Sequence, residues 1–272
     1  MTKKQALLLL PTALLCSLSA QASVVNITSA GAATANWFWF NDLTNTFTAD
    51  TISSAQTPPN SALGSVDMSI ASANDRLFVF TTQYSGVQLS QFTSLGYETF
   101  SVSGSTGSTL LAPTLQINIG LTSTDTTYRG RLVYSPSMVA SPDASAWDTW
   151  NPYTSQGGWF FSARDSANNS FKYNTNEPCV LGNAASSTAT CSLASILGRN
   201  STLAVSGTYK ALGFKTGGSN AVENSYADML TVGVNGADTT FDFQATPEPS
   251  TWLLMAGFTA AFLPRLRKSL RG

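Results

Sequence analysis

The sequence predicts an all-β protein: a single β-sandwich with one short helix, a cleaved N-terminal signal peptide and a C-terminal hydrophobic helix. Short runs alternate hydrophobic and polar residues, and Ser, Gly, Asn and Pro separate these runs. Charged residues make up only 11% of the 272 residues, which disfavours a coiled coil. We therefore expect a signal peptide at 1–22, a sandwich at 23–246 and a separate tail at 247–272.

The strand predictions rest on runs with a period of two residues, in which alternate side chains share one face. These runs are RLFVFTT at 76–82, TLQINIG at 114–120, TYRGRLVY at 127–134, TYKALGFK at 208–215, YADMLTVGV at 226–234 and TTFDF at 239–243. The run ANWFWFND at 35–42 holds four consecutive aromatic residues. Because so hydrophobic an edge strand would promote aggregation, we expect this run to form a buried strand.

One segment, CSLASILGRN at 191–200, has helical rather than strand periodicity. Ser192 is a suitable N-cap, and Leu193, Ile196 and Leu197 fall on one helical face. Gly198 is expected to end the helix. We expect this short helix to cover one end of the sandwich.

The N-terminus has the three parts of a secretory signal. Lys3 and Lys4 give the positive charge, an apolar stretch follows, and the small residues of Ala20–Ala22 favour cleavage before Ser23. Cys16 raises the alternative of a lipoprotein signal, although the residue before it is not small. An uncleaved membrane anchor is a further alternative. We expect the chain to be exported through the inner membrane.

Two cysteines, Cys179 and Cys191, remain after the signal is removed. In an oxidising compartment an even pair most simply forms a disulfide, here closing a small loop. Such a bond is worth about 3 kcal/mol in the chain-entropy model. Two buried thiols are the alternative, whereas two thiolates without histidine partners leave a metal site incomplete. We therefore expect no metal site.

The composition restricts the chemistry that the protein can perform. Histidine is absent, which excludes Ser-His-Asp and Cys-His catalysis and histidine metal ligands. Residues 23–246 hold eight Lys or Arg and fourteen Asp or Glu, a net charge of −6. Because contacts to phosphate backbones come from Lys and Arg, we expect no nucleic-acid binding. Nothing in the sequence indicates a cofactor.

The acidic residues give little support for a hydrolase. A glycosidase needs two acids positioned across the scissile bond. The ectodomain holds only three Glu, namely Glu98, Glu177 and Glu223, and its Asp residues mostly occupy turn contexts. We therefore expect no catalytic residues. A secreted polysaccharide-active enzyme on a lectin-like sandwich remains the competing hypothesis.

The tail consists of an apolar run and a basic end. Residues Trp252–Leu263 would form a helix of about 18 Å, against about 30 Å for a hydrocarbon core. With the helix at about 252–264, the basic end 265–272 would stay on the cytoplasmic side. Its basic residues are Arg265, Arg267, Lys268 and Arg271. A simple tail anchor and an amphipathic helix packed on the domain are the alternatives to a temporary anchor.

The motif Pro247-Glu248-Pro249, followed by an apolar run led by Trp and a basic end, resembles the PEP-CTERM sorting signal of Gram-negative bacteria. In that family exosortase recognises the signal, and the hosts commonly make exopolysaccharide. The resemblance implies processing near the motif, then release to the cell surface or extracellular matrix. Pro264 departs from the family pattern, in which the apolar run leads straight into Arg.

The order of the strand runs also resembles a jelly-roll ectodomain of secreted bacterial proteins, which is similar to carbohydrate-binding and lectin-like sandwiches. The runs that carry this resemblance are YETFSV at 97–102, LQINIG and RGRLVY, WDTWNPY at 147–153, GGWFF at 157–161 and the closing stretch 226–243. The turn GLTSTDTTYRG holds only Asp125, which weakens any calcium claim there. The resemblance implies the fold rather than a ligand.

Four aromatic residues are the candidate glycan contacts: Trp147, Trp150, Tyr153 and Trp159. Aromatic rings offer flat, rigid faces with a polar group at one end. The alternative is that these side chains cover the core. The function we expect is therefore a non-catalytic surface or biofilm-matrix protein with exosortase, the membrane and exopolysaccharide or another glycan as partners.

Overall fold

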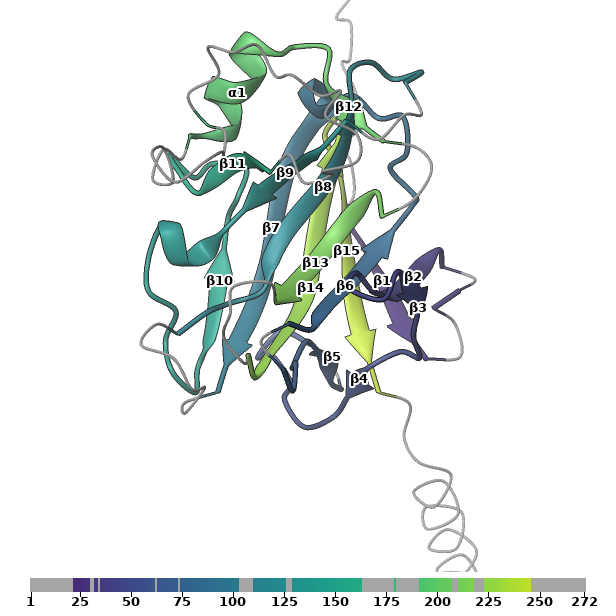
Figure 1. Cartoon of the computed structure of the whole chain (residues 1–272), viewed down its shortest axis with the longest axis vertical. Helices are drawn as coiled ribbons and strands as arrows, with labels where there is room; N and C mark the ends of the chain where they lie inside the picture. Colours follow the sequence, from purple (N-terminus) through teal and green to yellow (C-terminus); the bar gives the residue numbers. More distant parts are fainter. Residues whose placement is uncertain are drawn as a thin grey trace, which may run out of the picture.

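The structure is a computed structural model, and it confirms an all-β sandwich of two sheets, with one α-helix among the residues it describes (Figure 1). The described residues are 22–29, 32–33, 35–61, 63–72, 74–102, 110–125, 129–162, 179, 191–206, 210–217 and 223–245. Nearly all of the predicted signal peptide and the whole predicted sorting segment lie outside these residues. Within them, no helix has the length and apolar character required to cross a bilayer.

The first sheet has seven strands arranged around β14. They are β10 (Trp147–Trp150), β7 (Phe92–Ser101), β14 (Ser225–Val234), β15 (Ala237–Gln244), β1 (Ser23–Thr28), β5 (Ser65–Asp67) and β4 (Ile52–Ser53). Strand β7 pairs with one edge of β14. The other edge pairs first with β5 and then with β15. Only β1 and β15 pair in parallel; the other strand pairs are antiparallel.

The second sheet has eight antiparallel strands. They are β11 (Trp159–Ser162), β9 (Arg131–Tyr134), β8 (Thr114–Gly120), β13 (Leu212–Gly217), β6 (Arg76–Thr81), β2 (Trp37–Asn41) and β3 (Thr46–Phe47), with β12 (Ala204–Val205) beside β8. The alternation within each run fixes which side chains face inward. Leu115, Ile117 and Ile119, which share one face of β8, are fully buried.

Aromatic side chains fill the core where the two sheets face each other. Trp37 of β2 meets the rings of Phe241 and Phe243 of β15 edge-on, at centroid distances of 5.3 and 4.7 Å. Tyr97 of β7 packs against Phe214 of β13 at 5.6 Å. These contacts confirm that the aromatic run at 35–42 forms a buried strand.

The helix α1 (Leu193–Arg199) lies at one end of the sandwich (Figure 1). Ser192 caps it, because its hydroxyl accepts a hydrogen bond from the Ser195 amide at 3.2 Å. Leu193 and Ile196 are buried against the core. The prediction that Gly198 ends the helix is wrong: the helix continues through Arg199. Two 3₁₀ turns, η1 (Leu89–Gln91) and η2 (Pro136–Met138), complete the described helical structure.

Strand β14 contains a bulge where its partner changes from β5 to β15. The register with β7 shifts between Asp228 and Thr231, and Met229 adopts a φ of 53°. The amide of Phe243 donates to the side chain of Asp228 of β14 at 2.9 Å. An acidic side chain therefore completes the hydrogen bonding at this junction.

Candidate functional site

The four aromatic candidates do not form one surface. Trp159 is fully buried and donates from its indole to the Pro152 carbonyl at 2.7 Å. Trp150 is also buried, and its indole donates to the Thr99 hydroxyl at 2.7 Å. Both indoles therefore have their polar group satisfied inside the protein, as expected of core residues.

The other two candidates are partly exposed, and Trp147 belongs to a larger aromatic group. Cross-strand pairing places Trp147 beside Phe100 of β7, and Phe100 beside Tyr226 of β14. The ring centroids are 5.7 Å and 6.3 Å apart, respectively. We call these three residues the aromatic strip; they lie on the outer face of the first sheet. Tyr153 instead packs against the edge of the core.

The aromatic strip has polar neighbours. Thr149, two residues from Trp147 on the same strand face, is exposed, and Asp67 pairs with Tyr226. Burial and the charge of Asp67 raise the pKa of Tyr226, so its hydroxyl keeps its proton at neutral pH. Flat rings beside hydroxyl and carboxylate groups suit contact with a sugar ring.

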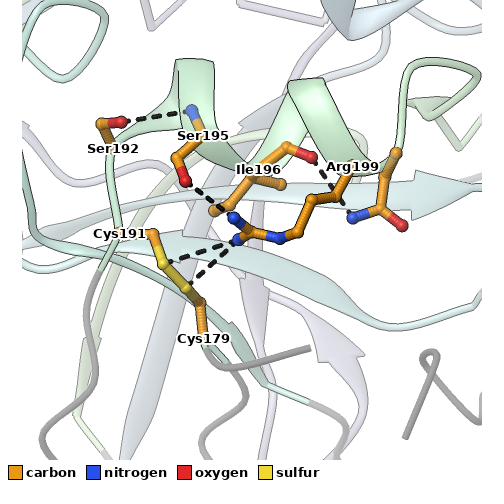
Figure 2. Close-up of a disulfide and its surroundings, with 7 residues drawn as sticks. Cys179, Cys191, Ser192, Ser195, Ile196 and Arg199 are labelled. Carbon is orange, nitrogen blue, oxygen red and sulfur yellow. Dashed lines mark hydrogen bonds between the residues drawn. A yellow bond between two sulfur atoms is a disulfide. The ribbon is translucent and has the colours of Figure 1, made fainter. Parts of the chain in front are cut away.

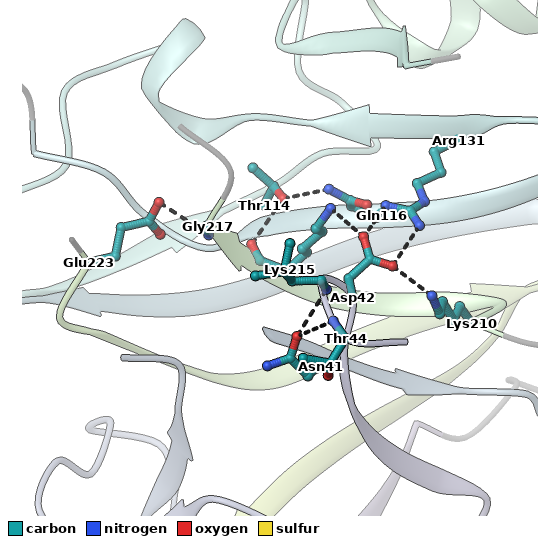
Figure 3. A network of polar contacts seen from close by, with 11 residues as sticks. Asn41, Asp42, Thr44, Thr114, Gln116, Arg131, Lys210, Lys215, Gly217 and Glu223 are labelled. Carbon is teal, nitrogen blue, oxygen red and sulfur yellow. Dashed lines mark hydrogen bonds and ion pairs between the residues drawn. The ribbon is translucent and has the colours of Figure 1, made fainter. Parts of the chain in front are cut away.

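A second candidate site is a network of charged side chains around Asp42 on the second sheet (Figure 3). Asp42 follows β2 directly, and Arg131 of β9 donates to both of its carboxylate oxygens at 3.1 and 3.2 Å. Lys210 donates at 2.6 Å and Lys215 of β13 at 3.0 Å. One carboxylate thus serves three cations.

Burial decides the electrostatics of this network. The side chains of Asp42, Lys210 and Lys215 are each only about a tenth exposed or less. Burial alone would raise the pKa of Asp42, but hydrogen bonds and charge from Arg131 and the two lysines hold that pKa well below its usual range. Burial, together with the charge of Arg131, lowers the pKa of Lys215 to about 8. Asp42 is therefore ionised throughout the physiological pH range.

Phenylalanine rings of β2 and β6 support the charged network. Phe40 and Phe78 form a separate buried cluster with Phe80. The Lys210 ammonium lies 3.7 Å from the centroid of the Phe40 ring, and the Arg131 guanidinium lies 5.8 Å from that of Phe78. Both are cation–π contacts, which add to the ion pairs. This network is built like a structural element of the sheet.

The predicted disulfide joins Cys179 and Cys191, whose Cα atoms are 5.9 Å apart (Figure 2). Both cysteines flank β11: Cys191 exchanges backbone hydrogen bonds with Trp159, and the Cys179 carbonyl accepts from the Phe161 amide at 2.7 Å. Arg199 of α1 lies against both sulfur atoms at 3.5 and 3.6 Å. The disulfide therefore connects β11 to the start of α1.

Asp42, Phe100 and Tyr226 were missed by the sequence reasoning, because their partners are distant in the chain. The predicted sorting motif at 247–249 and the basic residues of 265–272 lie outside the described residues. Among the residues that the structure describes, no group of three or more His, Cys, Asp or Glu side chains is arranged to hold a metal ion. Comparison of the chain with protein-family models, curated proteins and solved structures gives no match.

Proposed function

We propose that the protein is an exported, non-catalytic component of the cell surface or extracellular matrix of a Gram-negative bacterium, sorted by exosortase. The observation that carries this proposal is the order of features in the tail: Pro247-Glu248-Pro249, a short apolar run and a basic end. A helix of about 18 Å is a weak anchor in a core of about 30 Å. The tail therefore suits a temporary anchor that is later cut.

The point in the sequence where the sandwich ends supports this proposal. The last strand, β15, ends at Gln244, and the amide of Ala245 donates to the Leu63 carbonyl at 2.7 Å. The motif begins only two residues later, at Pro247. Because the strand pairing is complete before the motif, cutting there removes no strand of the sandwich.

The ectodomain would then act as a jelly-roll-like adhesive or structural unit with a glycan as its partner. The aromatic strip is the surface that best supports glycan contact, because its partly exposed rings Trp147 and Tyr226 lie in register on either side of the buried Phe100. A glycan array probed with the purified protein, together with a turnover assay on the host's own polysaccharide, separates the hypotheses. Binding without turnover is expected, whereas released product would favour the competing enzyme.

Alanine substitutions in the tail test the sorting proposal in cells that make exosortase. Glu248→Ala should keep the protein in the membrane fraction, because the motif is what the enzyme would grip in an exposed chain. Ser250→Ala is the matched control outside the motif and should reach the medium or cell surface normally. Release of the Glu248→Ala variant at the control level would contradict the proposal.

A further inference from the structure

The row of residues that forms the aromatic strip continues across the first sheet to an acidic side chain. Trp147 of β10 pairs with Phe100 of β7, and Phe100 pairs with Tyr226 of β14. Tyr226 pairs in turn with Asp67 of β5. Residues paired in this way lie side by side on one face, and because neighbouring strands are about 4.8 Å apart, the row spans about 14 Å. A carboxylate therefore stands at one end of a row of rings.

Asp67 is partly exposed, and its charge is not neutralised within the described part of the chain. Its Oδ1 accepts from the amide of Ser69 at 2.9 Å. No Lys or Arg among the described residues forms an ion pair with it. Burial and the charge of Asp67 raise the pKa of the Tyr226 hydroxyl, so the carboxylate acts on the aromatic residue beside it.

A second carboxyl group lies beside the middle of the strip. Glu98 is two residues from Phe100 on β7, so both side chains are on the same face, and it pairs with Thr149 of β10. Glu98 is 7% exposed, and one of its oxygens accepts from Asn60 at 3.1 Å. Its other oxygen is buried and has no hydrogen-bond partner. Since a buried carboxylate oxygen without a donor is unfavourable, a positive charge brought to the strip would offset part of that cost.

The strands of the first sheet all carry the same sign of charge. They contain no Lys or Arg and six acids, namely Asp67, Glu98, Asp148, Asp228, Asp238 and Asp242. A surface with one sign of charge attracts ligands of the opposite sign and repels those of the same sign. The sheet therefore disfavours an acidic polysaccharide on its outer face.

Rings and carboxylates together favour a ligand that is both flat and positively charged. An ammonium group is attracted to the face of an aromatic ring, and most strongly to that of Trp. The same group makes charge-assisted hydrogen bonds to a carboxylate. Aromatic rings also offer flat, rigid faces for the apolar side of a sugar. A sugar with a free amino group makes all these contacts, whereas a neutral sugar only stacks on the rings.

We propose that the aromatic strip and Asp67 select a glycan whose sugars carry free amino groups, and that the acids of the first sheet exclude glycans that carry carboxylate groups. This inference rests on the proposed contact between the strip and a glycan. The rings supply the contact with the sugar, and Asp67 and Glu98 supply the preference for the amino group. Because the preference is electrostatic, dissolved salt weakens it.

Binding of three oligosaccharides of equal length to the purified full chain tests the proposal. They are oligomers of glucosamine, which carries amino groups, of N-acetylglucosamine, which is neutral, and of galacturonic acid, which is acidic. Calorimetry at about pH 6 keeps the amino groups protonated. We expect the glucosamine oligomer to bind about tenfold more tightly than the N-acetylglucosamine oligomer, because several weak ion pairs add up, and the acidic oligomer not to bind. Raising sodium chloride from about 0.02 M to about 0.5 M should reduce this preference.

The variant Asp67→Asn isolates the charge, because it keeps the shape of the side chain. It should weaken binding of the glucosamine oligomer about threefold to fivefold, as expected for one partly exposed ion pair, and leave binding of the N-acetylglucosamine oligomer unchanged. Asp238→Asn is the matched control. Asp238 is an acid of the same sheet, but its partner Gly233 lies seven residues along β14 from Tyr226, about 20 Å away. This variant should bind as the wild-type chain does.

The possible outcomes separate this inference from the glycan contact on which it rests. If the glucosamine and N-acetylglucosamine oligomers bind equally and Trp147→Ala weakens both, the strip contacts glycan but the selectivity is wrong. If no oligomer binds the wild-type chain, the glycan contact itself is wrong, and the inference with it. An oligomer of lysine that binds as tightly as the glucosamine oligomer, with Trp147→Ala affecting neither, would mean that the sheet takes any polycation and would also overturn the proposal.

Discussion

The two sheets of the sandwich bury charge in opposite ways. The strands of the first sheet hold six acids and no bases, whereas those of the second hold three bases, Arg76, Arg131 and Lys215, and no acid. On the second sheet, Asp42 neutralises Arg131 and Lys215 by ion pairing. On the first sheet, no described cation pairs with Asp228, and burial raises its pKa to about 8. Pairing and protonation are the two means by which a low-dielectric interior tolerates a charged group.

The largest expected effect is the loss of Asp42. Asp42→Asn removes the negative charge that Arg131, Lys210 and Lys215 share. These three cations then lose their common counter-ion. Breaking a buried ion pair in this way costs about 3–5 kcal/mol. Urea unfolding measures the loss. Asp143→Asn, at an exposed position, is the control and should change stability by less than about 0.5 kcal/mol.

Substituting Asp228 on the first sheet should cost much less stability than Asp42→Asn. Asp228→Asn replaces a carboxyl group whose pKa burial raises to about 8 with a neutral amide of similar shape. If both substitutions destabilise the protein equally at pH 7, the two sheets do not differ as described.

The next largest effect concerns the covalent link beside β11. The double substitution Cys179→Ser, Cys191→Ser should lower the free energy of unfolding by about 3 kcal/mol, because the unfolded chain regains the freedom of the closed loop. The measurement is again urea unfolding, compared with the unreduced parent. Equal stability with and without reducing agent would indicate that the bond does not form.

A smaller effect separates the two sheets by the sign of their pH dependence. Folding lowers the pKa of Lys215 from 10.5 to about 8, so its contribution to stability rises with pH across this range. The contribution of Asp228 to stability instead falls as the pH rises toward about 8. In the wild-type chain this rise in the free energy of unfolding is up to about 1.4 kcal/mol per pH unit. The Lys215→Met variant should lack it, as measured by thermal melting between pH 8 and pH 10. A slope identical to that of the wild-type chain would contradict the assignment.

The smallest effect is on binding. Trp147→Ala should weaken glycan binding about fivefold to tenfold, the loss of roughly 1 kcal/mol that an aromatic contact contributes. Stability should change little, because Trp147 is partly exposed. Trp150→Phe is the comparison, since its ring lies in the core. If Trp150→Phe alone weakens binding in a glycan array, the aromatic strip is not the contact surface.

The sequence predicted the strands well because each strand depends on a local pattern. The alternation of Leu115, Ile117 and Ile119 is visible within seven residues, and so is the cap at Ser192. The early helix end at Gly198 was wrong because glycine is tolerated within an exposed turn whose neighbours are held by the core. The bulge at Met229 had no local signal, since it depends on where β5 gives way to β15.

The candidate sites were harder to predict because they join distant parts of the chain. Asp42 meets Lys215 from 173 positions away. Trp159 and Trp150 were expected either to contact glycan or to cover the core, and only the strand pairing distinguishes their buried positions from that of Trp147. The buried acids Glu98, Asp228 and Asp242 were not predicted as a group, because they lie on three different strands.

The intact mass of the protein recovered from the cell surface or medium tests the functional account most directly, in hosts with and without exosortase. With the enzyme, the account predicts a chain that starts at Ser23 and lacks the basic residues 265–272. Without it, the full tail should remain. A secreted chain that keeps its last residues in both hosts would contradict the account.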